Sequence, residues 1–282
     1  MPATTLEVAL IALLGLLIGS FLNVVVYRLP KMLEQRWLDE CAHLEKKPSR
    51  SVDPFNLVFP RSHCLRCGHQ IRWYENIPVL SFLGLRGRCA SCGSAISLRY
   101  PLVELGTAAL FGFCGWRWGI TSTALAWAGL TAALLTLGLI DWDTTLLPDD
   151  INLPLLWAGL VAAALRWIET PLDQALWGAV AGYLSLWSVY WGFRLLTGKE
   201  GMGYGDFKLF AALGAWFGWQ ALVPIILMAS VAGALVGIAM KLAGTLREGG
   251  YVPFGPFLAV AGLAMLVLGP QTFLSLIGLS MI

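Results

Sequence analysis

The sequence predicts an all-α polytopic membrane protein with about eight transmembrane helices and a zinc-knuckle cytoplasmic loop subdomain after helix one. Three observations predict it. The 282-residue chain is 57% hydrophobic and only 13% charged, against roughly 25% charged residues in a typical soluble domain. Its apolar runs approach the ~20 residues that cross a bilayer, and two Cys-x-x-Cys pairs lie in the single long polar stretch. A mean hydropathy of +0.71 excludes a disordered chain and argues against a soluble globule.

The eight apolar segments are separated by short polar turns everywhere except after the first. That first segment begins at Leu6 without a basic region before it and is followed by Arg28. It is therefore predicted to be a transmembrane helix rather than a cleaved signal peptide. We expect the segments at about 6–27, 102–119, 121–140, 151–168, 173–195, 206–219, 221–244 and 255–280.

The long polar stretch, residues 28–101, carries 12 of the 19 Lys and Arg residues but only 6 of the 17 acids. Positive loops tend to stay in the cytoplasm, so this stretch is expected there, with both chain ends on the opposite side. Residues 31–60 are expected to be irregular. The predicted domains are a first helix (1–27), a zinc-binding loop domain (28–101) and a transmembrane domain (102–282). A net charge of +2 says nothing about a polyanionic partner. The apolar segments indicate a lipid bilayer as partner, and no nucleic acid is expected.

The cysteine pairs predict a metal site. Cys64 and Cys67 form one pair, and Cys89 and Cys92 form the other after 21 residues. Two thiolates on a tight turn can hold one ion, and two such knuckles complete a tetrahedral zinc site with no open position for catalysis. We therefore expect a structural Zn²⁺. The alternative is a set of redox-active or unligated thiols.

Other potential ligands have simpler interpretations. His63 and His69 flank the first knuckle and could replace a cysteine, although solvated histidines are the expectation. Cys41 and Cys114 have no nearby cysteine. Cys114 lies in an apolar helix, so it is expected to behave as a small core residue.

Carboxylates in the apolar part of the chain predict catalysis, because ionisable side chains within a membrane are costly and rare and usually have a function. Asp141 ends one apolar segment and Asp206 begins another, on the same expected side of the membrane. Two carboxylates at a low-dielectric boundary share one proton, so one can accept a proton from water while the other polarises a carbonyl, as in aspartic proteases. Gly203 and Gly205 would let an extended peptide approach Asp206.

Structural alternatives exist for these acids. Asp149 or Asp150, next to Pro148, could cap the helix expected from residue 151. Asp143 is expected to be solvated. Asp206 could also be a helix cap after the glycines. The motif Pro253-Phe-Gly-Pro256 could line the site or simply begin a helix with a proline in its first turn.

Together these motifs resemble one known family. They are Gly19-Ser-Phe-Leu-Asn-Val-Val-Val-Tyr-Arg-Leu-Pro30, Pro60-Arg-Ser-His-Cys64, Asn76-Ile-Pro78, Arg99-Tyr-Pro101, Leu139-Ile-Asp141, Leu146-Leu-Pro-Asp149, Gly201-Met-Gly-Tyr-Gly-Asp206-Phe-Lys208 and Pro253-Phe-Gly-Pro256. Nearly the whole chain is similar to the bacterial prepilin leader peptidases of type IV pilus and type II secretion systems. These are membrane aspartic proteases with a Gly-x-Gly-Asp signature.

The resemblance implies a bifunctional enzyme of the bacterial inner membrane. It would cleave the basic leader of prepilins and pseudopilins after the leader glycine, on the cytoplasmic side, with Asp141 and Asp206 as catalytic residues. It would then methylate the new N-terminal residue with S-adenosylmethionine as methyl donor. Residues 102–282 would be the peptidase domain, and both termini would be periplasmic.

The resemblance also associates methyl transfer with the cytoplasmic loop, where Gly87 and Arg88 precede the third cysteine. No nucleotide-binding glycine motif occurs in the loop, so spacing predicts no donor site. Asp143, Asp149 and Asp150 are hypothesised to bind the basic leader. An ion-coupled transporter and a non-catalytic zinc-loop scaffold are the competing functions. The oligomeric state cannot be predicted.

Overall fold

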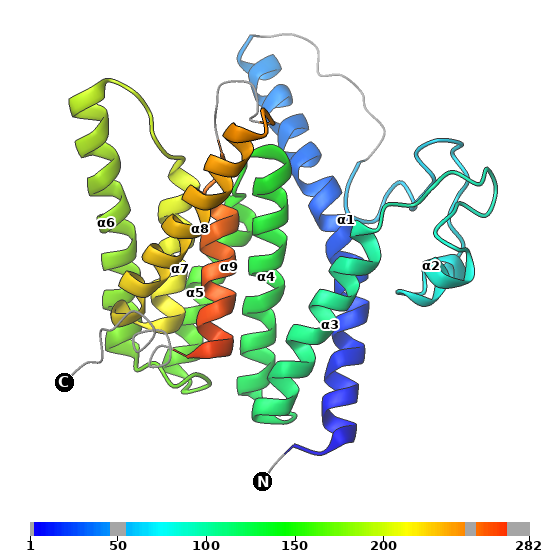
Figure 1. The fold of residues 1–282 in the computed structure, drawn as a ribbon, viewed down its shortest axis with the longest axis horizontal. Helices are drawn as coiled ribbons and strands as arrows, with labels where there is room; N and C mark the ends of the chain where they lie inside the picture. The colour runs from blue at the N-terminus through cyan, green and yellow to red at the C-terminus, as the bar shows by residue number, and fades with distance from the viewer. Residues whose placement is uncertain (1–2, 46–54, 246–251, 270–282) are drawn as a thin grey trace. The chain divides into compact units, whose positions relative to one another are not determined.

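The computed structural model describes residues 3–45, 55–245 and 252–269, and within these ranges it is helical with no strand (Figure 1). By contacts the chain divides into an N-terminal unit, Met1–Ala128, and a C-terminal unit, Gly129–Ile282. The division falls inside helix α4. The α-helices are α1 (Thr5–Leu44), α2 (Leu80–Gly84), α3 (Arg99–Trp118), α4 (Ser122–Thr144), α5 (Asp149–Ala164), α6 (Leu172–Thr197), α7 (Tyr204–Phe217), α8 (Leu222–Leu242) and α9 (Gly255–Leu268).

Each of the eight expected apolar segments overlaps one helix of the described residues, namely α1 and α3–α9 in turn. Within the described ranges, three helical stretches are long and apolar enough to cross a membrane, and α9 is a shorter apolar helix. The three are Thr5–Leu44, Ser122–Thr144 and Trp219–Leu242, the last of which joins the short 3₁₀ helix η2 (Trp219–Ala221) to α8.

The expected end of the first helix near residue 27 is wrong, because α1 continues to Leu44. Residues 31–44 are therefore helical rather than irregular. Pro30 lies inside the helix, and the residues after it are mostly good helix formers such as Leu, Glu, Gln and Arg. At the other end, Thr4 and Glu7 form a capping box, with Glu7 N–H donating to the Thr4 hydroxyl at 3.3 Å. The expected loop at 46–54 lies outside the described residues.

Proline and glycine set most of the other helix ends. Pro148 and Pro171 directly precede α5 and α6, and Gly198 ends α6 in the left-handed conformation with φ +69°. Helix α9 ends at Leu268, before Gly269, so it is shorter than the expected segment 255–280. The part of that segment beyond residue 269 lies outside the described residues.

In the N-terminal unit, α1 packs along α3 (Figure 1) through two small residues one helical turn apart. A Cβ atom at Gly15 would lie 2.7 Å from Cβ of Phe111, and one at Gly19 would lie 2.8 Å from Cα of Glu104. Small residues at this spacing let two helix backbones approach closely. The contact fixes the residue-28 end of α1 beside the start of α3.

In the C-terminal unit, α7 is the central helix and contacts α5, α6, α8 and α9. Ten consecutive residues from Phe207 onward include no exposed side chain. Gly178 and Gly182 of α6 lie against Gly214 and Phe210 of α7 so closely that a Cβ at Gly178 would overlap the Gly214 carbonyl group. Asp206 is therefore held in the first turn of the most enclosed helix of the unit.

Candidate functional site

The two predicted catalytic aspartates are both buried in the C-terminal unit. Asp141 lies near the end of α4 and is 5% exposed, whereas Asp206 lies in the first turn of α7 and is 3% exposed. The structure brings them close enough for direct electrostatic repulsion. Buried charges are normally paired with an opposite charge, so two neighbouring buried acids are an expensive arrangement that points to function.

One oxygen atom of this pair has no partner. Oδ1 of Asp206 is buried and accepts no hydrogen bond in the described part of the chain. Gly203 is the N-cap residue of α7, and a Cβ there would lie 3.7 Å from Asp206 Oδ2. The N-cap position of α7 is therefore occupied by Gly203 rather than by Asp206, and no side chain makes a capping hydrogen bond there. Because buried polar atoms are rarely left unsatisfied, the orphaned oxygen indicates a place for water or a substrate group.

Gly255 lies beside Asp141, Gly203 lies beside Asp206, and Gly205 lies beside Leu147. A Cβ at Gly255 would lie 2.6 Å from Oδ2 of Asp141 and 3.0 Å from Leu147 Cδ1. A Cβ at Gly205 would lie 2.6 Å from Cβ of Leu147. Leu147 therefore packs against both glycines. Gly205 makes room for Leu147, and Gly203 has the more open position, where a Cβ would meet only Asp206 Oδ2 at 3.7 Å.

Gly255 is the residue that sequence reasoning did not assign. The Pro253–Pro256 motif, which contains Gly255, was the sequence feature that pointed to it. That motif was expected either to line the site or to begin a helix. The structure supports both, because Pro256 lies in the first turn of α9 while Gly255 touches Asp141.

The neighbouring acids do not cap α5. Its N-cap residue is Pro148, and no side chain makes a capping hydrogen bond. Asp143, Asp149 and Asp150 are all exposed. Asp149 forms an ion pair with Lys208, whose Nζ lies 2.7 Å and 2.6 Å from its two carboxylate oxygens. This pair ties the start of α5 to α7 two residues beyond Asp206.

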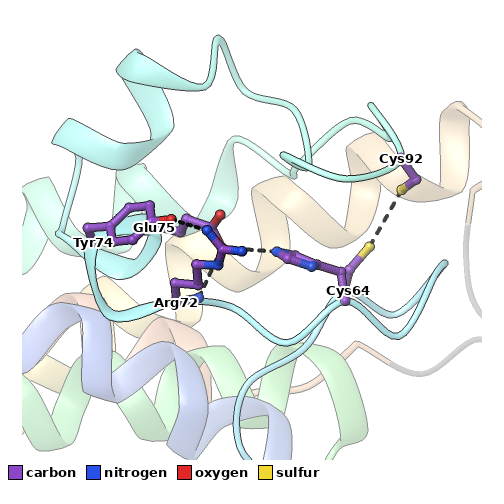
Figure 2. Close-up of polar contacts among 6 residues, drawn as sticks. Cys64, Arg72, Tyr74, Glu75 and Cys92 are labelled. Carbon is purple, nitrogen blue, oxygen red and sulfur yellow. Dashed lines mark hydrogen bonds and ion pairs between the residues drawn. The ribbon is translucent and has the colours of Figure 1, made fainter.

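The four predicted cysteines converge on one point in the N-terminal unit. Their Sγ atoms all lie within 4.8 Å of one another, and Figure 2 shows the Cys64–Cys92 pair, with Sγ atoms 3.9 Å apart. Four sulfurs around zinc at about 2.3 Å are themselves separated by roughly 3.8 Å. All four thiols are free of disulfides. The cluster therefore fits a tetrahedral zinc ion.

The two cysteine pairs have the same backbone geometry. Cys64 N–H donates to the His69 carbonyl at 2.9 Å, and Cys89 N–H donates to the Ser94 carbonyl at 2.8 Å. Gly68 and Gly93 follow each pair with φ +72° and +70°, a conformation that glycine adopts most readily. The backbone N–H of Cys67, together with that of Arg66 and the Ser94 hydroxyl, lowers the pKa of Cys64 to about 6. These groups thus favour the thiolate form of Cys64, which is the form that binds metal.

The flanking histidines lie outside the metal cluster of the described residues. His69 pairs with Glu75 at 3.1 Å, and His63 Nδ1 lies 3.1 Å from the Arg61 carbonyl oxygen. Cys114 is fully buried in α3, as expected of a core residue, and Cys41 is exposed.

Gly87, which the family resemblance associates with methyl transfer, adopts φ +68°. A Cβ there would lie 2.9 Å from Cζ of Phe82. Arg88 forms an isolated antiparallel bridge with Ala95 across the second knuckle. Both residues therefore shape the loop that carries Cys89 and Cys92.

Known protein families and individual proteins resemble this chain over most of its length. The model of the bacterial peptidase A24 N-terminal domain matches residues 13–118, and the model of the type IV leader peptidase family matches residues 128–238. The chain is 55% identical to a prepilin leader peptidase/N-methyltransferase of Pseudomonas aeruginosa, over 92% of this chain and 89% of the relative. The chain belongs to the prepilin leader peptidase/N-methyltransferase family.

Further members of the family are similar over nearly their full length. The relative from Pseudomonas putida is 52% identical, covering 95% of this chain and 93% of the relative. The relative from Burkholderia pseudomallei is 49% identical, covering 98% and 90%. No solved structure matches the chain. Family membership and the apolar helices identify a membrane protein.

Proposed function

We propose that this chain cleaves the leader peptide of prepilins and pseudopilins after the leader glycine and then methylates the new N-terminus. The relatives named above are prepilin leader peptidase/N-methyltransferases. The observation that carries the peptidase half is the pair of buried aspartates with its unpartnered Asp206 oxygen. The methyltransferase activity is proposed from the names of these relatives.

In the proposed cleavage, Asp141 and Asp206 share one proton. The ionised aspartate accepts a proton from a water molecule, which attacks the carbonyl carbon of the leader glycine. The protonated aspartate donates to the carbonyl oxygen. Collapse of the tetrahedral intermediate breaks the C–N bond, and the departing amine takes up a proton. The unpartnered oxygen of Asp206 is available for the water or the carbonyl group.

The proposed methyl transfer uses the amine that cleavage exposes. S-adenosylmethionine supplies the methyl group. The four cysteines would hold zinc, and the knuckles would thereby keep the loop around Gly87 and Arg88 in shape, which is a structural role because four thiolates leave no open coordination position. The chain's part is to bind the donor and to bring the uncharged amine to it.

The proposed topology places eight transmembrane helices in the bacterial inner membrane, with both termini periplasmic. The excess of Lys and Arg in residues 28–101 supports a cytoplasmic loop. The aspartates, at the end of α4 and the start of α7, then face the cytoplasm. This suits a substrate whose basic leader is cytoplasmic and whose apolar helix is already in the bilayer. Gly203 and the exposed acids Asp143, Asp149 and Asp150 are the proposed contacts for the leader.

A mass measurement on a prepilin tests both activities. The purified full chain, in lipid nanodiscs, is incubated with a prepilin with and without S-adenosylmethionine. We expect loss of the leader mass in both samples and a further gain of one methyl group only with the donor. An uncleaved prepilin, and no cleavage of other pilin-like substrates, would contradict the peptidase function and favour the transporter or scaffold.

A further inference from the structure

The N-terminal unit contains a cavity of about 610 Å³ between the cysteine knuckles and the adjoining ends of α1 and α3. A cavity of this size suits a single small molecule, since ligand pockets typically span about 300–1,000 Å³. Its lining is chemically mixed, with one buried cation, two acids and several aromatic rings. The peptidase mechanism above uses none of these groups.

The buried cation is Arg28 of α1, which is 6% exposed. Its guanidinium group donates to the carbonyl oxygens of Asn56 and Pro60 at 2.9 Å and 2.6 Å and lies over the Phe55 ring. These described contacts include no carboxylate. A buried charge without a counter-ion is costly, so the cavity lacks one anionic group beside Arg28.

The acids are Glu104 of α3 and Glu75 of the 3₁₀ helix η1 (Trp73–Asn76). Glu104 is 8% exposed, and its Oε2 accepts a hydrogen bond from Val79 N–H at 2.7 Å. Glu75 Oε2 accepts from Arg72 N–H at 2.9 Å and pairs with His69, in the polar cluster of Figure 2. In both side chains Oε1 accepts no hydrogen bond from the described residues. The Oε1 atoms of Glu75 and Glu104 can therefore interact with cationic groups or hydroxyl groups of a ligand.

Aromatic side chains complete the lining. Tyr27, Phe82 and Tyr100 contribute rings to the cavity, and such rings stack on nucleobases and attract cations. Phe82 is also the ring that a Cβ at Gly87 would touch. A change at Gly87 would therefore displace part of the cavity wall.

We propose that this cavity is the binding site for S-adenosylmethionine, an inference that rests on the proposed methyltransferase function. Arg28 binds the carboxylate of the methionine part. Glu75 and Glu104 bind the ammonium group, the sulfonium centre and the ribose hydroxyls, and the aromatic rings hold the adenine. A lipid phosphate would satisfy Arg28 but be repelled by the acids. A pilin N-terminal amine would satisfy the acids but leave Arg28 without an anion.

Donor binding by charge variants tests the proposal. The zinc-loaded full chain in nanodiscs is dialysed against S-adenosylmethionine labelled in its methyl group. Glu104→Gln keeps an acceptor for Val79 N–H and removes only the charge, so we expect binding about ten-fold weaker. Glu75→Gln should act in the same direction. Glu34→Gln, an exposed acid of α1 that does not line the cavity, is the matched control and should bind like wild type.

A second ligand locates the sulfonium. S-adenosylhomocysteine has a neutral sulfur but the same carboxylate, ammonium, ribose and adenine. The acid nearest the sulfonium is the one whose substitution weakens S-adenosylmethionine more than S-adenosylhomocysteine. Zinc content and leader cleavage in the same samples establish that each variant is folded.

The remaining outcomes separate this proposal from the function on which it rests. Wild-type affinity for the donor in both glutamate variants, with methyl transfer by wild type intact, would overturn the cavity assignment alone. Unchanged donor affinity with a raised KM for the pilin would assign the cavity to the acceptor instead and also overturn it. A wild-type chain that binds no donor and transfers no methyl group would contradict the methyltransferase function itself.

Discussion

Gly255 controls the space beside Asp141, because a Cβ atom there would lie 2.6 Å from Oδ2 of the carboxylate. Gly255→Ala should push the carboxylate away from its position, and misplacement of a catalytic group by about 1 Å can cost roughly 100-fold in rate. We expect kcat for leader cleavage to fall by about that factor. Gly192→Ala in α6 is the control, because a Cβ there meets no neighbour. Equal rates for the two variants would mean that Asp141 tolerates displacement.

Gly87 combines a backbone constraint with a steric one, since its φ is +68° and a Cβ would lie 2.9 Å from Phe82. Gly87→Ala should strain the turn by about 1 kcal/mol and move the Phe82 ring in the cavity wall. We expect methyl transfer to fall at least ten-fold while leader cleavage continues. The two products are quantified by mass spectrometry from one reaction. Gly84→Ala, at a position with open space, should retain both activities.

At the level of helices, close packing of α6 on α7 supports the position of Asp206. Gly178→Ala would place a methyl group into the Gly214 carbonyl group, and such overpacking typically costs about 1–3 kcal/mol. We expect a lower thermal unfolding midpoint in detergent and reduced cleavage. The matched variant on the same helix is Gly192→Ala, whose methyl group would enter open space. A Gly178→Ala protein as stable as this control would show that the two helices can separate without cost.

The positions of the helices could be predicted well because the length of an apolar run, and the prolines and glycines at its ends, are local features of the sequence. Helices α5 and α6 begin after Pro148 and Pro171, and α6 ends before Gly198, close to the bounds expected for these segments. The extension of α1 beyond Arg28 could not be predicted from the sequence, since polarity alone does not distinguish a charged loop from a helix that leaves the membrane. Helix α9 ends at Leu268, before Gly269, and the rest of the expected segment lies outside the described residues.

Some residues of the candidate sites could be predicted from the sequence, and others could not. The four cysteines and the two aspartates were identified from spacing and position, and the structure brings each set together. Gly255 and the cavity around Arg28 depend on contacts between segments distant in sequence, which no local pattern encodes. Gly205 was assigned to substrate approach, whereas the structure fills the space beside it with Leu147.

At the scale of the whole molecule, the sites proposed for the two activities lie in different units. The cysteines and the cavity lie within Met1–Ala128, and both aspartates lie within Gly129–Ile282. Removal of zinc, by chelation or by Cys89→Ser, should therefore reduce methyl transfer and donor binding far more than leader cleavage. Cys41→Ser, at an exposed cysteine outside the cluster, should leave zinc content at one ion per chain. Cleavage and methylation lost in equal proportion would show that the units depend on each other.

The central claim is that Asp141 and Asp206 act together in cleavage, and the most direct test is the cleavage rate of single asparagine variants. Asp141→Asn and Asp206→Asn keep size and hydrogen-bonding capacity but cannot share a proton as a carboxylate pair. We predict that each lowers kcat at least about 1,000-fold, comparable to the loss of a general acid or base. Asp173→Asn, at an exposed aspartate in the first turn of α6, should cleave at close to the wild-type rate. Cleavage that survives in either Asp141→Asn or Asp206→Asn would contradict the account and leave that aspartate a structural role only.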